Sequence, residues 1–226
     1  MFAVIFEVQP KKERFDDYLN YAKMLKPQLE ATDGFIDNER FTSHRQEGRI
    51  LSLSTWRDEK SVVRWRTVAD HHAIQEKGRF EVFEDYHLRV GEIIADTAVP
   101  KGEALREQRF DETEIGAAKA VTITELPAIE GEKPASENLV RDLGAPDAGS
   151  RGVVDHEVFE SIYNPGKLLL LVGWSDAAAA RAWAPKALAS GAPRHRCVRV
   201  VRDYGMFDRR EAPQHYPEVA RPASSR

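Results

Sequence analysis

The sequence has 226 residues, of which 42% are hydrophobic, and its formal net charge is −4. Acidic and basic residues are interspersed, so no basic footprint for nucleic acid is present, and the apolar run Met1–Val8 is too short for a membrane span or a signal peptide. The single cysteine, Cys197, cannot form an internal disulfide, which indicates a reducing compartment and predicts a cytoplasmic protein.

The first part of the chain predicts the element order strand, helix, two strands, helix, strand. Apolar residues at helical spacing predict a first helix from Phe15 to Leu29, with Pro27 kinking it or marking its later turn. Asp58 is a suitable N-cap for a second helix, which carries Trp65. The expected strands are Phe2–Val8, Phe35–Thr42, Arg49–Trp56 and Phe80–Ile94.

The same pattern returns 118 residues later. Trp56 and Trp65 are nine residues apart, as are Trp174 and Trp183, and these are the only four tryptophans. Over residues 34–65 and 152–183, 11 of 32 positions are identical without a gap. So long a register indicates an internal duplication whose copies are each of domain size.

The second copy is the poorer one. Its first helix is expected to shrink to about Ala135–Leu143, and its second, Ala177–Trp183, to stop before Pro185. The segment between the copies is polar, with a short helix expected at Glu103–Gln108. The predicted division is a first domain of residues 1–97, a linker of residues 98–115, a second domain of residues 116–207, and an extended tail of residues 208–226.

This element order predicts an α+β fold. A βαββαβ unit covers only one face of its antiparallel sheet with helices, so the other face needs an apolar partner. Two such ferredoxin-like sheets cover each other when they pack into a barrel. The duplication supplies both halves in one chain, which predicts an intramolecular α+β barrel, or pseudo-dimer. Whether two chains then pair as a homodimer is left open.

Several motifs together resemble the antibiotic biosynthesis monooxygenase (ABM) family. The resemblance covers residues 2–94 well and residues 117–212 more faintly. The residues that carry it are Trp56-Arg57-Asp58-Glu59, Trp65-Arg66, His71, Gln75, Gly78-Arg79, Phe83, Asp85-Tyr86, Arg89-Val90 and the stretch from Arg202 to Arg209. The resemblance implies a tandem-repeat member of the dimeric α+β barrel superfamily. It also implies a cofactor-independent monooxygenase that oxidises an electron-rich aromatic substrate, a phenol, hydroquinone or polyketide-like compound, with dioxygen to a quinone.

Such chemistry requires a base, a site for an aromatic ring and exclusion of bulk water. His71 suits the base because its ordinary pKa lies near 6.5. Trp65 and Tyr86 are the further catalytic candidates, Tyr86 as a hydrogen-bond donor to a developing oxyanion. An unbroken helix places His72 rather than His71 on the face of Trp65, whereas the resemblance favours His71. The substrate-binding candidates are His72, Phe83, Arg66, Arg40 and Asn38.

Other functions are kept as alternatives. The sequence has no Gly-rich phosphate loop after its first strand, and His71-His72 lacks the spacing of a metal site, so we expect neither flavin nor metal. A heme-binding or heme-degrading monooxygenase is the second enzyme hypothesis, weakened because the first strand has no Asn. A non-catalytic barrel that binds a small ligand is the third. The working cavity is expected between the sheet and the helices of the first copy, with the second copy mainly structural.

Overall fold

The computed structural model describes residues 1–128, 136–188 and 191–212. In the first half, the strands are β1 (Phe2–Pro10), β2 (Phe35–Ser43), β3 (Ile50–Trp56) and β4 (Phe83–Asp96), and the helices are α1 (Phe15–Glu30), α2 (Glu59–Arg66) and α3 (Ala69–Lys77). In the second half, the strands are β5 (Ala120–Leu126), β6 (Val153–Ser161), β7 (Leu168–Trp174) and β8 (Arg194–Gly205), and the helices are α4 (Leu139–Asp142) and α5 (Ala177–Ala182).

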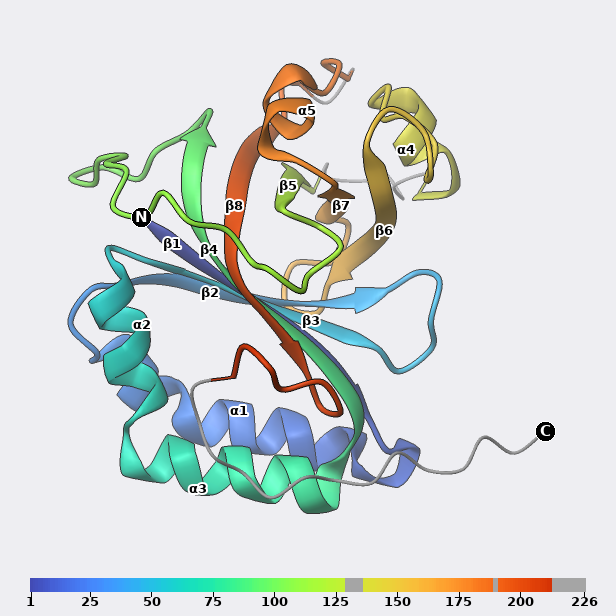
Figure 1. Ribbon diagram of the computed structural model, residues 1–226. Helices are drawn as coiled ribbons and strands as arrows, with labels where there is room; N and C mark the ends of the chain where they lie inside the picture. The colour runs from blue at the N-terminus through green and yellow to red at the C-terminus, as the bar shows by residue number, and fades with distance from the viewer. Residues whose placement is uncertain (129–135, 189–190, 213–226) are drawn as a thin grey trace.

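The strands form one closed antiparallel barrel in the order β1-β3-β2-β6-β7-β5-β8-β4. Each half keeps the same order, β4-β1-β3-β2 in the first and β8-β5-β7-β6 in the second. The two sheets join where β2 pairs with β6 and where β4 pairs with β8. The predicted α+β barrel of two ferredoxin-like sheets is therefore confirmed, and Figure 1 shows both sets of strands around one axis.

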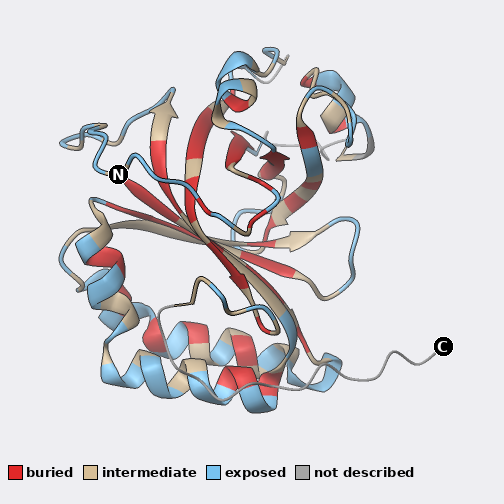
Figure 2. Cartoon of the chain, viewed as in Figure 1, coloured by how far each residue is buried: buried red, intermediate tan, exposed pale blue. Residues whose placement is uncertain are grey.

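The barrel interior is the main hydrophobic core, and both halves contribute to it. Each strand sends alternate side chains inward, and Figure 2 shows the buried residues concentrated on the strands. The fully or almost fully buried members include Ile5, Phe41, Leu51, Ile93, Ile123, Phe159, Leu169 and Val200. Because this core takes the inner face of the sheets, the helices pack on the outer face, where α1, α2 and α3 lie around one end of the barrel (Figure 1).

Local structure departs from the sequence expectation at three places. The second helix of the first half breaks at Thr67 and Val68 into α2 and α3, because Val68 is extended. The closing strand begins at Phe83 rather than at residue 80, after a π-helical turn, η2 (Gly78–Val82). Residues 103–108 form no helix.

Other expectations agree with the structure. Pro27 lies inside the last turns of α1, where Leu25 and Leu29 stay buried. The first helix of the second half is reduced to a 3₁₀ turn (Ser136–Asn138) and α4, and Ala135 lies outside the described residues. Of the predicted tail, only residues 208–212 are described. Within the described ranges, none of the helices has the length and apolar character that a membrane span needs.

Candidate active site

A cavity of about 230 Å³ lies between the outer face of the first sheet and the helices α1, α2 and α3. It is therefore outside the barrel core. Two rows of side chains cross five adjacent strands to form its floor. In register from β8 to β2, one row consists of Arg202, Val90, Val4, Ser54 and Asn38, and the other of Tyr204, Leu88, Phe6, Ser52 and Arg40. The floor is thus apolar in the middle and polar at both ends.

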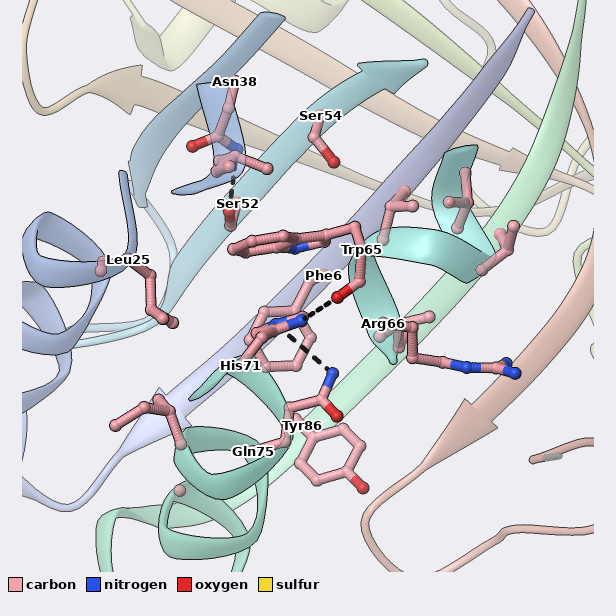
Figure 3. A pocket seen from close by; sticks show the side chains of 18 of the residues that line it. Phe6, Leu25, Asn38, Ser52, Ser54, Trp65, Arg66, His71, Gln75 and Tyr86 are labelled. Carbon is pink, nitrogen blue, oxygen red and sulfur yellow. Dashed lines mark hydrogen bonds between the residues drawn. The ribbon is translucent and has the colours of Figure 1, made fainter. Parts of the chain in front are cut away.

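The break between α2 and α3 places His71 in this cavity. Its imidazole stacks on the indole of Trp65 with ring centroids 4.2 Å apart and an interplanar angle of 18°. Nδ1 of His71 lies 2.9 Å from the backbone oxygen of Trp65, and Nε2 lies 3.4 Å from Nε2 of Gln75 (Figure 3). A carbonyl oxygen only accepts, so Nδ1 carries the proton, and the lone pair of Nε2 accepts from the Gln75 amide group.

This environment keeps His71 neutral. Burial against Trp65 and the apolar wall lowers the pKa of His71 to about 4, although its hydrogen bond to the oxygen of Trp65 opposes the shift. At neutral pH the side chain is therefore a proton acceptor at Nε2. An anion bound nearby raises the pKa of His71 and makes it a stronger base.

Aromatic rings form the wall next to His71. Phe6 lies 5.7 Å from Tyr86 and 6.0 Å from Phe83 between ring centroids, and Tyr18 of α1 lies 5.8 Å from Phe83. The absence of a side chain at Gly78, the first residue of the π-helical turn, makes this packing possible, because a Cβ there would lie 2.6 Å from the Phe83 ring. Inclined rings of this kind offer both faces and edges to a bound ring.

The lining is strongly cationic. Arginines 40, 66, 79, 202 and 209 all line the cavity, and Glu59 is the one carboxylate among the described lining residues. Glu59 is itself bound to Arg109, 2.7 Å away. Arg79 is only 2% exposed and donates to the Tyr86 hydroxyl over 2.8 Å. Arg209 donates to the same oxygen.

The structure gathers all but one of the residues predicted from the sequence. Those that line the cavity are His71, Trp65, Tyr86, Phe83, Arg66, Arg40 and Asn38. His72 does not line it and is exposed on α3, because the break at Val68 turns its neighbour His71 inward. The lining comes mainly from the first half, as predicted. The catalytic and binding roles of these residues remain predictions.

Sequence reasoning missed the contribution of the second half. Arg202, Tyr204 and Arg209 line the cavity, although that half was expected to be mainly structural. Barrel closure makes β8 the neighbour of β4, and the register sets Arg202 opposite Val90 and Tyr204 opposite Leu88. The predicted barrel and the alternation along β8 were the signals that would have found the first two of these residues.

The described residues of the cavity do not form a recognisable set of metal ligands. Within the described ranges, no group of three or more His, Cys, Asp or Glu side chains lies together in a way that could hold a metal ion. His71 has Trp65 and Gln75 as its ring-nitrogen partners, and the described residues of the two floor rows include no carboxylate.

The barrel architecture and the helix-covered cavity define a class of α+β barrel proteins, and comparison with known proteins narrows it. The antibiotic biosynthesis monooxygenase family profile matches residues 1–77. A protein of Pyricularia oryzae named jasmonate monooxygenase ABM is 45% identical over 226 residues, covering 97% of this chain and 100% of that protein. The chain therefore belongs to the antibiotic biosynthesis monooxygenase family, and it is a monooxygenase.

Two other comparisons are more distant. The uncharacterized protein YqjZ of Bacillus subtilis is 29% identical over 92 residues, covering 41% of this chain and 78% of that protein. An aldoxime dehydratase solved with butyraldoxime has a TM-score of 0.54 at 11% identity, covering 88% of this chain and 79% of that one. The second likeness shows a shared fold only.

Proposed function

We propose that this monooxygenase oxidises a small ring-bearing substrate with dioxygen in the cavity beneath Trp65, and that His71 is the base. The observation that carries the proposal is the fixed imidazole. Trp65 holds the ring from one face and accepts from Nδ1, so that Nε2 is left to take a proton. The apolar middle of the floor and the helices over it limit the access of bulk water to the same place.

The proposed reaction needs a substrate whose anion gives an electron to dioxygen. For a phenol, Nε2 of His71 takes the hydroxyl proton, and the phenolate transfers one electron to dioxygen. The phenoxyl radical and superoxide then combine at a ring carbon. The imidazolium returns its proton to the peroxide, which loses water and leaves a quinone. One phenol and one dioxygen thus give one quinone and one water, without an external reductant.

Two substrate classes fit this cavity, and each has its own support. The inclined rings of Phe6, Phe83 and Tyr86 favour an electron-rich aromatic compound that becomes a quinone. The name of the Pyricularia oryzae relative favours a jasmonate, which is a cyclic ketone that bears a carboxylate. Removal of a proton next to a ring ketone also gives an electron-rich anion. The role of His71 is therefore the same in both cases.

The test is dioxygen uptake by the purified protein without added cofactor, with a hydroquinone series and a jasmonate as substrates. Mass spectrometry after reaction in ¹⁸O₂ should show one labelled oxygen atom in the product. His71→Gln should lower turnover by about 10²–10⁴. His72→Gln is the matched control, because His72 is exposed on the same helix, and it should keep wild-type turnover.

Four results would contradict the proposal. Equal activity of His71→Gln and the wild type would remove the base. Unlabelled product would remove dioxygen as the oxygen source. A Soret band in the purified protein, or activity that appears only after heme is added, would favour the heme alternative. Binding of both substrate classes without oxygen consumption would favour the non-catalytic barrel.

A further inference from the structure

One end of the cavity floor presents hydrogen-bond donors for which the described residues supply no acceptor. We propose that the hydroxyl groups of Ser52 and Ser54, together with Arg40, bind a carbonyl oxygen of the substrate at this end. Both serines lie on β3, Arg40 lies opposite Ser52 on β2, and all three line the cavity. The proposal rests on the proposed function, because the bound oxygen takes up negative charge when His71 removes the substrate proton.

Each serine hydroxyl has a partner that can only donate to it. Nε1 of Trp56 donates to Oγ of Ser54 over 2.9 Å, and an indole N–H cannot accept. Nδ2 of Asn38 donates to Oγ of Ser52 over 3.2 Å and to the backbone oxygen of Leu53 over 3.0 Å. The carbonyl of Leu53 only accepts, so it fixes which end of the amide is the nitrogen. Both hydroxyl oxygens therefore accept, and their hydrogens are left to donate into the cavity.

The two hydroxyl groups are spaced to share one oxygen atom. Ser52 and Ser54 are two residues apart on the same face of β3, about 6.5 Å along the strand. Two O–H···O bonds of about 2.7 Å nearly span this distance, and a carbonyl oxygen has two lone pairs to receive them. Each hydroxyl already accepts from an N–H group, which polarises it and makes it a stronger donor.

Arg40 adds a positive charge beside this pair. Its Cα is the register partner of that of Ser52, so the two side chains start next to each other. Within the described residues, Arg40 takes part in no ion pair, and its buried Nε has no hydrogen-bond partner. The neighbouring carboxylate, Glu39, is occupied by Lys167. The charge of Arg40 is therefore best balanced when negative charge develops on a ligand oxygen beside Ser52.

The subsite and His71 lie on opposite sides of the Trp65 indole. His71 stacks on one face of the ring, and Figure 3 shows Ser52 and Ser54 on the other side. The oxygen that the serines bind is therefore not the atom from which His71 takes a proton. Negative charge reaches such a remote oxygen only through conjugation. The substrate class that fits is a ring compound whose acidic group is conjugated with a carbonyl, such as a hydroxyaryl ketone.

The experiment uses 4′-hydroxyacetophenone and 4-ethylphenol, which share a phenol and a two-carbon substituent and differ in the carbonyl oxygen. Calorimetry on the full-length protein measures the affinity of each. The wild type should prefer the ketone by about 10–100-fold. Arg40→Gln should lower that preference by about tenfold, and Ser52→Ala by about 2–10-fold, as expected for a charged and a neutral donor. Ser52 is chosen over Ser54 because Asn38 keeps its bond to Leu53, whereas the buried indole of Trp56 would lose its acceptor.

Two controls match these variants. Arg45→Gln removes an exposed arginine that binds Glu157. Thr42→Val removes a hydroxyl on β2 that donates to the backbone oxygen of Glu160. Neither residue is among the described residues that line the cavity, so both variants should keep the wild-type preference for the ketone.

The outcomes separate the subsite from the reaction. His71→Gln should lose turnover and keep the preference for the ketone. A preference without oxygen consumption by any substrate refutes the proposed function and leaves the subsite standing. Equal affinity of the wild type for the two probes overturns the subsite, as does wild-type preference in both Arg40→Gln and Ser52→Ala. Tighter binding of 4-hydroxybenzoate than of 4′-hydroxyacetophenone also overturns it, since the site would then select a carboxylate.

Discussion

The two halves of the barrel share their strand order but treat the space behind their tryptophans differently. In the first half, Trp65 stacks on His71 and both face a cavity. In the second half, Trp183 lies 5.8 Å from Trp174 and meets the ring of His195 edge-on at 5.1 Å. There the tryptophan fills the space that the first half leaves to a ligand.

The difference comes from the helices and not from the sheets. The first half has α1, α2 and α3, with 16, 8 and 9 residues. The second has α4 and α5, with 4 and 6. Long helices carry enough apolar surface to pack on the sheet at their ends and still leave a cavity beneath their middle. Short helices must pack directly on the strands along their whole length. A duplicated sheet thus holds a site only where its covering helices are long.

The largest expected difference between the halves is in stability, at the glycine that packs against the first turn of the second helix in each half. Gly34 and Gly152 are equivalent glycines with φ of +84° and +82°. A Cβ at Gly34 would lie 2.0 Å from Oγ of the buried Ser61, whereas one at Gly152 would lie 3.1 Å from Cβ of Ala179. Gly152→Ala should cost about 1–2 kcal/mol of backbone strain, and Gly34→Ala about 1–3 kcal/mol more from overpacking.

Urea unfolding of the two variants measures this difference. Ser61 also donates to the N-cap Asp58 of α2, 2.8 Å away, so Gly34→Ala should reduce activity as well, by shifting the helix that carries Trp65. Adding Ser61→Gly to Gly34→Ala should recover part of the stability. Equal losses of unfolding free energy in the two variants would show that backbone strain alone causes the loss, and that packing at α2 is no tighter than at α5.

The sequence predicted the barrel because the evidence for it is repetitive. The offset of 118 residues fixes Trp56 on Trp174, and the structure buries both to 1% exposure or less. Each indole donates over 2.9 Å, Trp56 to Ser54 and Trp174 to Thr122. Alternation and helical spacing then sufficed to place the strands and most of the helices.

The site was harder to predict, because it depends on small backbone irregularities and on pairing between distant strands. The choice between His71 and His72 turns on one extended residue, Val68, inside a stretch with helical spacing. Arg79 enters the cavity from a π-helical turn that reads as strand by composition. Arg209 arrives through the packing of a loop that follows β8, and neither periodicity nor spacing carries that information.

Replacing Trp65 and Trp183, the second tryptophan of each half, tests whether the first half binds the ligand and the second half serves packing. Trp183→Phe loses the hydrogen bond from Nε1 to the oxygen of Gly144, 3.1 Å away, and leaves a gap in the core. It should cost about 1–2 kcal/mol of stability and leave turnover unchanged. Trp65→Phe should lower stability less, because Trp65 faces a cavity, and should raise KM through its lost stacking on His71.

Thermal unfolding and steady-state kinetics on the same two preparations decide this point. The two roles are distinguished if Trp183→Phe lowers mainly the melting temperature and Trp65→Phe lowers mainly kcat/KM. It breaks if Trp183→Phe lowers kcat/KM as much as Trp65→Phe does, since the second half would then support the chemistry directly.

The smallest expected effect is the pH dependence of activity, and it compares the two buried histidines. Burial lowers the pKa of both His71 and His195 to about 4. A histidine with a depressed folded pKa is neutral in the native state at pH 6, while the unfolded chain already binds protons. The contribution of these histidines to stability is therefore complete above the ordinary pKa near 6.5 and falls as the pH drops toward 4.

In contrast, kcat/KM should change less than about twofold between pH 8 and pH 5.5, because the imidazole of His71 in the free enzyme stays neutral throughout. His195→Gln should weaken the acid loss of stability and leave this flat profile intact. A midpoint of kcat/KM near pH 6.5 would mean that the base is solvated, and that the contact with Trp65 does not set its protonation.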